Sequence, residues 1–319
     1  MNVQNESEYE DLLSLWSDLE AGLAVILASP DSVQEFELRV WQYDRWMQDL
    51  LRRDTDVGLY LLFQLATNSP VGYSGSHALV CAVLCHLIAV ELNLAREERD
   101  SLVHAALTMN IGMTALQDEL ATQMERPNQQ QQDAIRAHPV KGGMMLANIG
   151  IVDDLWLDIV TSHHDELPDK GELWQVSPAR RLARIVRVVD RYAAMISPRR
   201  SRVGRSASES VRSIIGEPGD QSDLIGHSLV RIVGLCPPGT YVRLDSGDIA
   251  VVMRRSSKPN YPHVAIVLNE IDELLPQPRL HRTAQGSPQI RSALAASSVR
   301  VRLNHHLVLQ LGAYAAQQP

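Results

Sequence analysis

Apolar residues recur every three or four positions from residue 12 onward, and this spacing predicts amphipathic helices. The first stripe runs over residues 12–27 and the second over 36–50, with a turn at Ser29-Pro30-Asp31 between them. A third helix is predicted over 57–65 and ends before Pro70. The N-terminal part of the chain is therefore expected to be helical.

The helical pattern is strongest from Ser76 onward. Cys81, Leu84, Cys85 and Ile88 share one face of a long apolar helix. Further helical segments are predicted over 96–107, from 129 to 135, over 146–160 and over 178–195.

The pattern changes after Arg199. Residues 197–210 are rich in arginine and serine, which predicts an exposed connection. Alternating and β-branched residues over 241–244 and 249–253 flank Asp245-Ser246-Gly247, which predicts a hairpin. A third β-rich run covers 264–268, and loops are predicted over 275–279 and 283–289.

Together these patterns predict a mostly α protein with a small β-containing C-terminal region. We expect an N-terminal helical region over 1–70 and a helical domain over 71–205. A linker and the small β-rich region are expected over 206–319.

Composition adds bounds on function. The 319 residues are 45% hydrophobic, which is enough for a folded chain with a packed core. The net charge of −8 means that the protein as a whole has no positive electrostatic field that would attract nucleic acid. No apolar run reaches the ~18 residues needed to cross a bilayer. Three cysteines form no disulfide framework, so we expect a cytoplasmic protein without a membrane span.

The candidate chemistry lies in histidines and one aspartate. His77 begins an apolar helix, His138 precedes Pro139, His163 and His164 are adjacent, and Asp190 interrupts an apolar stretch. Imidazole and carboxylate groups suit Zn, Fe, Mn or Ni, and helical bundles build such sites from inward side chains. Taken singly, each residue also fits a structural role: Asp190, for example, suits a buried partner of an arginine on its own helix.

The order of these residues resembles the HD-GYP group of HD-superfamily phosphohydrolases over about residues 73–203. The resemblance rests on His77, Ala105 to Met113, His138-Pro139, His163-His164-Asp165-Glu166 and Val189 to Ala194. It implies a bacterial signalling protein with a helical bundle that holds two or three metal ions, usually iron or manganese. The activity it implies is hydrolysis of cyclic di-GMP. The tail near Pro237-Pro238-Gly239 is also similar to tails of some members.

The chain departs from the family pattern at several positions. Met109-Asn110 replaces the His-Asp doublet, whose aspartate bridges two metals in the family. Met113 replaces the family's lysine, and Tyr73 replaces a glutamate that binds the third metal. Leu167 to Glu172 stands where the Gly-Tyr-Pro signature is expected.

The resemblance places His138, His163 and His164 around one metal ion, and His77 and Asp190 at a centre that has lost ligands. We therefore expect at most one divalent ion (Fe, Mn or Zn). Arg199 and Arg202 align with family arginines that contact nucleotide phosphate, although a solvated basic linker fits them equally well.

The leading hypothesis is a degenerate HD-GYP-type protein in cyclic di-GMP signalling. It would bind a cyclic dinucleotide or an unidentified signalling protein, with little or no phosphodiesterase activity. One alternative is an active phosphohydrolase with a single metal, in which Asp165 or Glu166 acts as general base. Another is a purely structural scaffold that binds partners. No nucleic-acid partner is expected.

Overall fold

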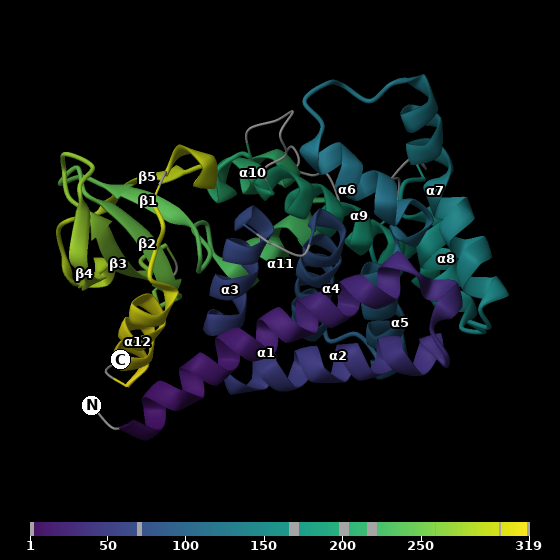
Figure 1. The fold of residues 1–319 in the computed structure, drawn as a ribbon, viewed down its shortest axis with the longest axis horizontal. Coiled ribbons are helices and arrows are strands. Elements are labelled where there is room, and N and C mark those ends of the chain that lie inside the picture. The colour runs from purple at the N-terminus through teal and green to yellow at the C-terminus, as the bar shows by residue number, and fades with distance from the viewer. Residues whose placement is uncertain are drawn as a thin grey trace.

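The structure is a computed structural model that describes residues 3–68, 72–165, 172–197, 204–215, 222–258, 260–299 and 301–317. Helices fill one end of the elongated molecule, and a five-stranded sheet lies at the other end (Figure 1). The predicted fold class, mostly α with a small C-terminal β region, is confirmed.

The N-terminal helices follow the predicted stripes. They are α1 (Val3–Ala28), α2 (Phe36–Arg53) and α3 (Thr55–Asn68), with a short 3-10 turn at Pro30–Ser32 between the first two. α1 and α2 lie side by side, and both α1 and α3 pack on the next helix, α4 (Figure 1).

The middle of the chain forms a bundle around α4 (Tyr73–Glu91), which is buried on nearly every side. The other helices of the bundle are α5 (Arg96–Thr108), α6 (Thr114–Thr122), α7 (Gln129–Asn148), α8 (Asp154–Ser162) and α9 (Pro178–Ile196), with a 3-10 turn, η2 (Ile111–Met113), before α6. Among the described residues, α4 alone has the length and apolarity of a membrane-crossing helix, but 83% of its apolar window is buried inside the bundle. Its apolarity is accounted for by its place in the core.

Two predictions in the helical part were wrong. The stretch 146–160 is not one helix, because the chain turns at Gly150, whose φ of +98° lies in the left-handed region that glycine tolerates. The expected exposed connection over 197–210 includes the start of α10 (Ala207–Ile214), which Ser206 and Glu209 cap reciprocally. α11 (Ser222–Val233) follows, and residues 198–203 lie outside the described residues.

The C-terminal sheet is antiparallel, with the strand order β4-β3-β2-β1-β5. Its strands are β1 (Tyr241–Leu244), β2 (Ile249–Arg254), β3 (His263–Leu268), β4 (Leu274–Arg282) and β5 (Ile290–Leu294). The predicted hairpin is confirmed, because Tyr241 pairs with Val251 across the turn.

The predicted loop over 275–279 is instead part of β4. Pro276 and Pro278 are tolerated because β4 is an edge strand, and its pairing with β3 shifts register between Ile266 and Leu268. Proline there removes no hydrogen bond that the ladder needs.

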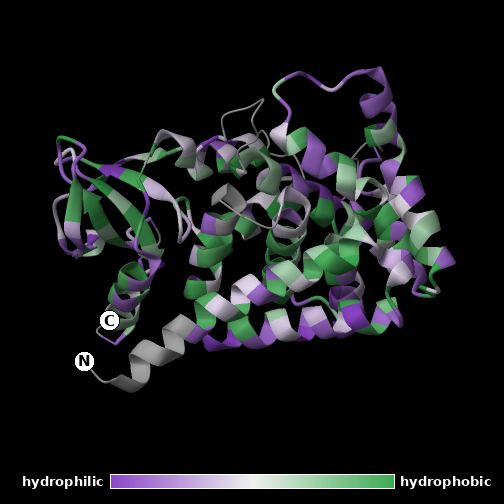
Figure 2. Ribbon diagram, in the orientation of Figure 1, coloured by the Kyte–Doolittle hydropathy of each residue, from purple (hydrophilic) through white to green (hydrophobic). Residues whose placement is uncertain are grey.

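One connected core joins the helices to the sheet. Buried apolar residues from α1 through α11 form a single cluster with one face of the sheet, and α12 (His305–Ala316) packs against the same strands. Ion pairs also join them: Arg254 lies 2.7 Å from Asp54, and Arg255 lies 2.6 Å from Asp56. Figure 2 shows largely hydrophobic residues along the strands and inside the bundle, and a hydrophilic outward side on α2.

Candidate metal centre

His138 is held in place by the proline that follows it. Pro139 lies inside α7 and has no N–H, so the carbonyl of Ile135, four residues earlier, lacks its helical donor. The Nδ1 atom of His138 donates to that carbonyl at 2.5 Å. The His-Pro pair therefore fixes the ring and leaves Nε2 as the nitrogen that faces the interior.

His163 is fixed in the same way at the end of α8. The last carbonyls of a helix lack intrahelical donors. Nδ1 of His163 donates to the carbonyl of Val160 at 2.7 Å. His164 follows at the surface, and its ring centroid lies 4.2 Å from that of His163 and 5.2 Å from that of His138.

The two fixed rings leave two acceptors facing each other. Nε2 of His138 lies 3.2 Å from Nε2 of His163. Burial lowers the pKa of His163 to about 3 and also lowers the pKa of His138, so both rings are neutral at pH 7. Each backbone carbonyl can only accept, so the single proton of each ring stays on Nδ1. The two Nε2 lone pairs therefore converge, and a divalent cation between them would be bound by both. The imidazoles of His138, His163 and His164 together form a three-histidine group that fits such an ion.

His77 and Asp190 form a second group across α4 and α9. Nε2 of His77 lies 2.8 Å from Oδ1 of Asp190, and the His77 side chain is 1% exposed. Burial acts to raise the pKa of Asp190, but the hydrogen bond from His77 and nearby histidines outweigh it and lower this pKa to about 2. Asp190 is therefore a carboxylate at neutral pH. Its partner is His77, and Arg187 instead donates to the carbonyl of Asp165 at 3.1 Å.

The two groups are neighbours. The negative charge of Asp190 acts to raise the pKa of both His138 and His163, although burial prevails at each. The five predicted ligands thus come from four helices into one region of the bundle. Their binding of a metal stays a prediction, and Arg199, Arg202 and Glu166 lie outside the described residues.

The positions that depart from the family pattern lie at the start of α4, at the end of α5 and in η2. Met109 ends α5 with its side chain buried in the core, and Asn110 follows at the start of η2. The ring of Tyr73 stacks on His77, with centroids 5.3 Å apart and planes 16° from parallel. Met113 lines an apolar cavity of about 320 Å³ together with Leu27 and Met145.

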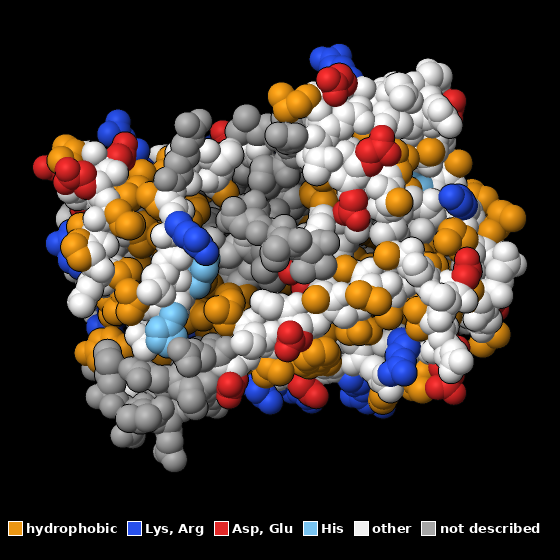
Figure 3. Space-filling model, in the orientation of Figure 1, with side chains coloured by type: hydrophobic (Ala, Val, Ile, Leu, Met, Phe, Trp, Pro, Cys, Tyr) orange, Lys and Arg blue, Asp and Glu red, His pale blue; other side chains and the backbone are white. Residues whose placement is uncertain are grey.

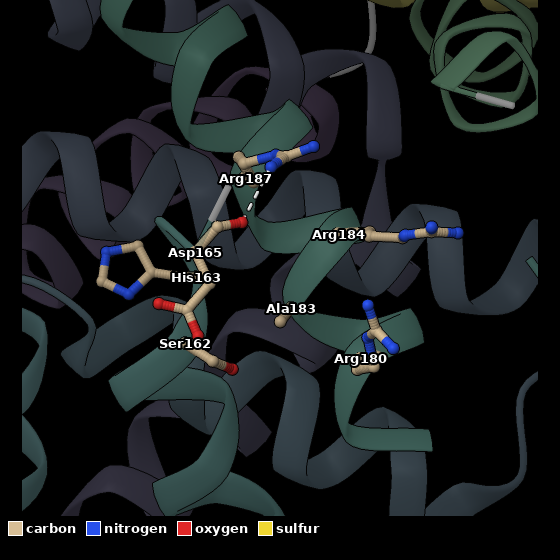
Figure 4. Close-up of a pocket in the computed structure, with 7 residues that line it drawn as sticks. All are labelled: Ser162, His163, Asp165, Arg180, Ala183, Arg184 and Arg187. Atoms are coloured by element: carbon tan, nitrogen blue, oxygen red, sulfur yellow. Dashed lines mark hydrogen bonds between the residues drawn. The ribbon is translucent and has the colours of Figure 1, made fainter. Parts of the chain in front are cut away.

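Two features near the site were not predicted from the sequence. Cys81, one turn after His77, places Sγ 3.6 Å from His77 Nε2. The spacing of four residues on one helix could have shown this. Arg180, Arg184 and Arg187 line a small pocket with Ser162 and His163 (Figure 4). The helical spacing of Arg180, Arg181, Arg184, Arg187 and Arg191 by itself predicts a single polar face of α9. Arg181 departs from that prediction, because it is buried and paired with Glu98 at 2.5 Å.

The pocket and the histidine cluster lie on opposite sides of His163. Figure 4 shows the His163 ring pointing away from the three arginine side chains. On the face in Figure 3, acidic and basic side chains are interspersed, with no single basic surface among the residues described there.

A helical bundle that gathers imidazoles and a carboxylate from α4, α7, α8 and α9 defines a candidate metal-binding protein of the helical class. The chain belongs to the HD domain family, which its residues 61–223 match, more than half of its length. This confirms the predicted resemblance to the HD superfamily.

Two relatives agree with this assignment. The chain is 28% identical over 254 residues to cyclic di-GMP phosphodiesterase PA4108 of Pseudomonas aeruginosa, covering 77% of this chain. The chain spans only 57% of the length of that relative. The solved structure of Bd1817, an HDG"Y"P protein of Bdellovibrio bacteriovorus, has a TM-score of 0.51 at 13% identity, with 71% of this chain and 72% of that chain covered. This second likeness shows the fold.

Proposed function

We propose that the chain is a degenerate HD-GYP-type protein of bacterial cyclic di-GMP signalling, which binds the cyclic dinucleotide and hydrolyses it poorly or not at all. The family assignment and the named activity of the Pseudomonas relative support the ligand class. The absence of a carboxylate at the Met109-Asn110 positions supports the loss of hydrolysis.

The facing Nε2 atoms of His138 and His163, 3.2 Å apart, carry the metal part of the proposal. These two atoms and the His164 ring would hold one divalent ion. When bound, such an ion supplies a Lewis acid that polarises a phosphoryl oxygen. The backbone carbonyls of Ile135 and Val160 keep each ring in the orientation and tautomer that this requires.

Asn110 accounts for the expected weak turnover. Two-metal phosphoester hydrolysis needs both ions held about 3.5–4 Å apart around a shared nucleophile. A neutral amide at Asn110 adds no negative charge between two cations, and Met109 offers a thioether where hard ions prefer nitrogen or oxygen. Loss of several kcal/mol of barrier lowering reduces a rate by orders of magnitude.

The test compares binding with turnover in the full chain. Titration calorimetry with cyclic di-GMP and Mn²⁺ measures binding, and chromatography of the nucleotide products measures hydrolysis. The double variant Met109→His/Asn110→Asp restores the doublet of the family. We expect the unaltered chain to bind the dinucleotide with little turnover, and the double variant to hydrolyse faster.

Two outcomes would contradict the proposal. Absence of cyclic di-GMP binding would remove the ligand assignment. Robust hydrolysis by the unaltered chain would remove the claim of degeneracy. If that hydrolysis were lost in Asp165→Asn, the alternative of an active single-metal phosphohydrolase would be favoured.

A further inference from the structure

A cavity of about 600 Å³ lies where the helical bundle meets the C-terminal sheet. Its walls come from the start of α3, the end of α11 and the connection between β2 and β3, and β2 packs beside α3 (Figure 1). We propose that this cavity binds a nucleoside monophosphate. It shares no residue with the three-histidine group, so the inference does not depend on the proposed function.

The size and the apolar walls of the cavity suit a small organic molecule. Small-molecule sites in proteins occupy roughly 300–1,000 Å³, lie preferentially between domains, and combine apolar walls with a few polar groups. Val230, Leu235 and Pro262 supply apolar surface here, which suits one face of a nucleobase. Asn260 adds a side-chain amide, which both donates and accepts hydrogen bonds as ribose hydroxyls require.

Basic side chains outnumber acidic ones in the wall of the cavity. Arg231, Arg255 and Lys258 line it, and Asp56 is the one acidic residue among its described lining residues. Arg231 also pairs with Glu91 at 3.0 Å, but both side chains are well exposed, and such a pair is weak. A phosphate monoester carries a charge of about −1.5 to −2 at pH 7. The excess of positive charge therefore favours a ligand that ends in a phosphate over a neutral one.

Arg255 is already oriented for an anion. Its Nε atom donates to Oδ1 of Asp56 at 2.6 Å, and its Nη1 atom donates to the carbonyl of Ile232, near the end of α11, at 2.5 Å. Among the described residues, its Nη2 atom has no hydrogen-bond partner, although a guanidinium carries five N–H donors. Because two contacts fix the guanidinium, ordering it around a phosphate adds little to the entropic cost of binding.

Lys258 adds a second cation on the opposite wall, in the connection between β2 and β3. The hydroxyl of Ser256 donates to the carbonyl of Lys258 at 2.9 Å and accepts from its N–H at 3.1 Å, so the backbone that carries this lysine is held in place. No carboxylate in the described part of the chain pairs with its ammonium group. Lys258 is exposed, so its substitution should leave folding unchanged and report on the ligand.

Titration calorimetry of the full chain with AMP and with adenosine tests the ligand class. We expect AMP to bind, and adenosine, which lacks the phosphate, to bind at least about 10-fold more weakly. Lys258→Ala and Lys258→Gln should each weaken AMP binding by about 10-fold, as loss of a charge-assisted hydrogen bond predicts. Lys141→Ala is the matched control, because it removes an exposed lysine that lines the cavity at Met113 instead.

Cys236 gives a second measurement inside the cavity itself. It lines the cavity, whereas Cys81 and Cys85 are fully buried, so a thiol reagent should modify the folded chain at Cys236 alone. Burial raises the pKa of the Cys236 thiol to about 11, so its alkylation is slow and can be followed by mass spectrometry. We expect AMP to slow this alkylation, and the same AMP concentration to protect less in Lys258→Ala.

Four results would each overturn the proposal. They are absence of AMP binding, equal affinity for adenosine, AMP affinity that is unchanged in both substitutions of Lys258, and AMP binding that leaves the alkylation rate of Cys236 unchanged. Loss of AMP binding in Lys141→Ala with none in Lys258→Ala would place the nucleotide in the other cavity and would likewise contradict the assignment.

Discussion

The Nε2 atom of His138 lies 3.2 Å from the Nε2 atom of His163, and each ring donates its Nδ1 proton to a carbonyl three residues earlier in its own helix. Two neutral imidazoles thus present lone pairs to the same small volume. Without a cation or proton between them, this contact is repulsive. A site shaped in this way gains stability from an ion that binds only the folded chain.

Mn²⁺ should therefore stabilise the protein through the three histidines. At a concentration 100 times its dissociation constant, an ion that binds only the folded state adds about 2.7 kcal/mol. We expect Mn²⁺ to raise the melting temperature of the unaltered chain, and this increase to be lost in His163→Ala. His227→Ala, which alters an exposed histidine on α11, should retain it. An increase of equal size in His163→Ala would contradict the assignment.

Pro139 should affect stability and metal binding in opposite directions. Pro139→Ala supplies the missing N–H to the carbonyl of Ile135, which favours the helix by up to ~3 kcal/mol. The new donor also competes with His138 Nδ1 for that carbonyl, and loss of such support weakens metal affinity by about 10-fold or more. Chemical denaturation and Mn²⁺ titration measure the two effects.

Pro178→Ala is the matched control for this substitution. Pro178 occupies the first turn of α9, where its missing N–H has no helical partner to lose. We expect little change in either measurement. If stability and Mn²⁺ affinity both rose or both fell in Pro139→Ala, the proline would not act through the His138 ring.

The sequence was sufficient to predict α1 to α5, α9, the β1–β2 hairpin and the family, because each depends on local spacing or on the order of motifs. It missed the break at Gly150 and the short helices α6, α10, α11 and α12. It could not predict Cys81 as a neighbour of Asp190. α4 is apolar on every side, so its pattern does not show which face meets α9. It also missed β4, because Pro276 and Pro278 normally break strands and only the position of β4 at the sheet edge makes them acceptable.

Gly112 should be needed to keep η2 close to α7. A Cβ atom at Gly112 would lie 2.6 Å from the carbonyl oxygen of His138 and 2.9 Å from the amide nitrogen of Gly142. Both are backbone atoms that cannot rotate away. We expect Gly112→Ala to cost about 1–3 kcal/mol of unfolding free energy and to weaken Mn²⁺ binding, because α7 must shift.

Gly142→Ala tests the same contact from the opposite side. A Cβ atom there meets its nearest neighbours at 3.4 Å, which is ordinary contact, and alanine favours the helix by up to about 1 kcal/mol. We expect unchanged or slightly higher stability from urea unfolding. Equal destabilisation by both alanines would mean that helix contact at Gly112 is not the cause.

The ion pair between Asp44 and Arg99 should make the protein sensitive to acid. Arg99 donates to both carboxylate oxygens of Asp44, at 2.6 and 2.9 Å, and Asp44 is 1% exposed. Burial acts to raise the pKa of Asp44, but hydrogen bonds and charge from His104 and Arg99 hold it below the ordinary value of 3.8. The pair therefore contributes its full stabilisation above pH ~4, and this is lost as the pH falls through the lower pKa of the folded state.

Asp44→Asn removes the buried charge that faces Arg99, while Arg99 keeps Asp100 as an ionic partner and still donates to His86. We therefore expect a cost at pH 7 somewhat below the ~3–5 kcal/mol of an uncompensated buried charge. The difference in unfolding free energy between the variant and the unaltered chain should shrink as the pH falls below ~4, because acid protonates Asp44 in the unaltered chain. Asp49→Asn, which breaks an exposed ion pair with Arg52 on the same helix, should change stability little at either pH. A difference for Asp44→Asn that is independent of pH would show that packing, and not charge, stabilises this contact.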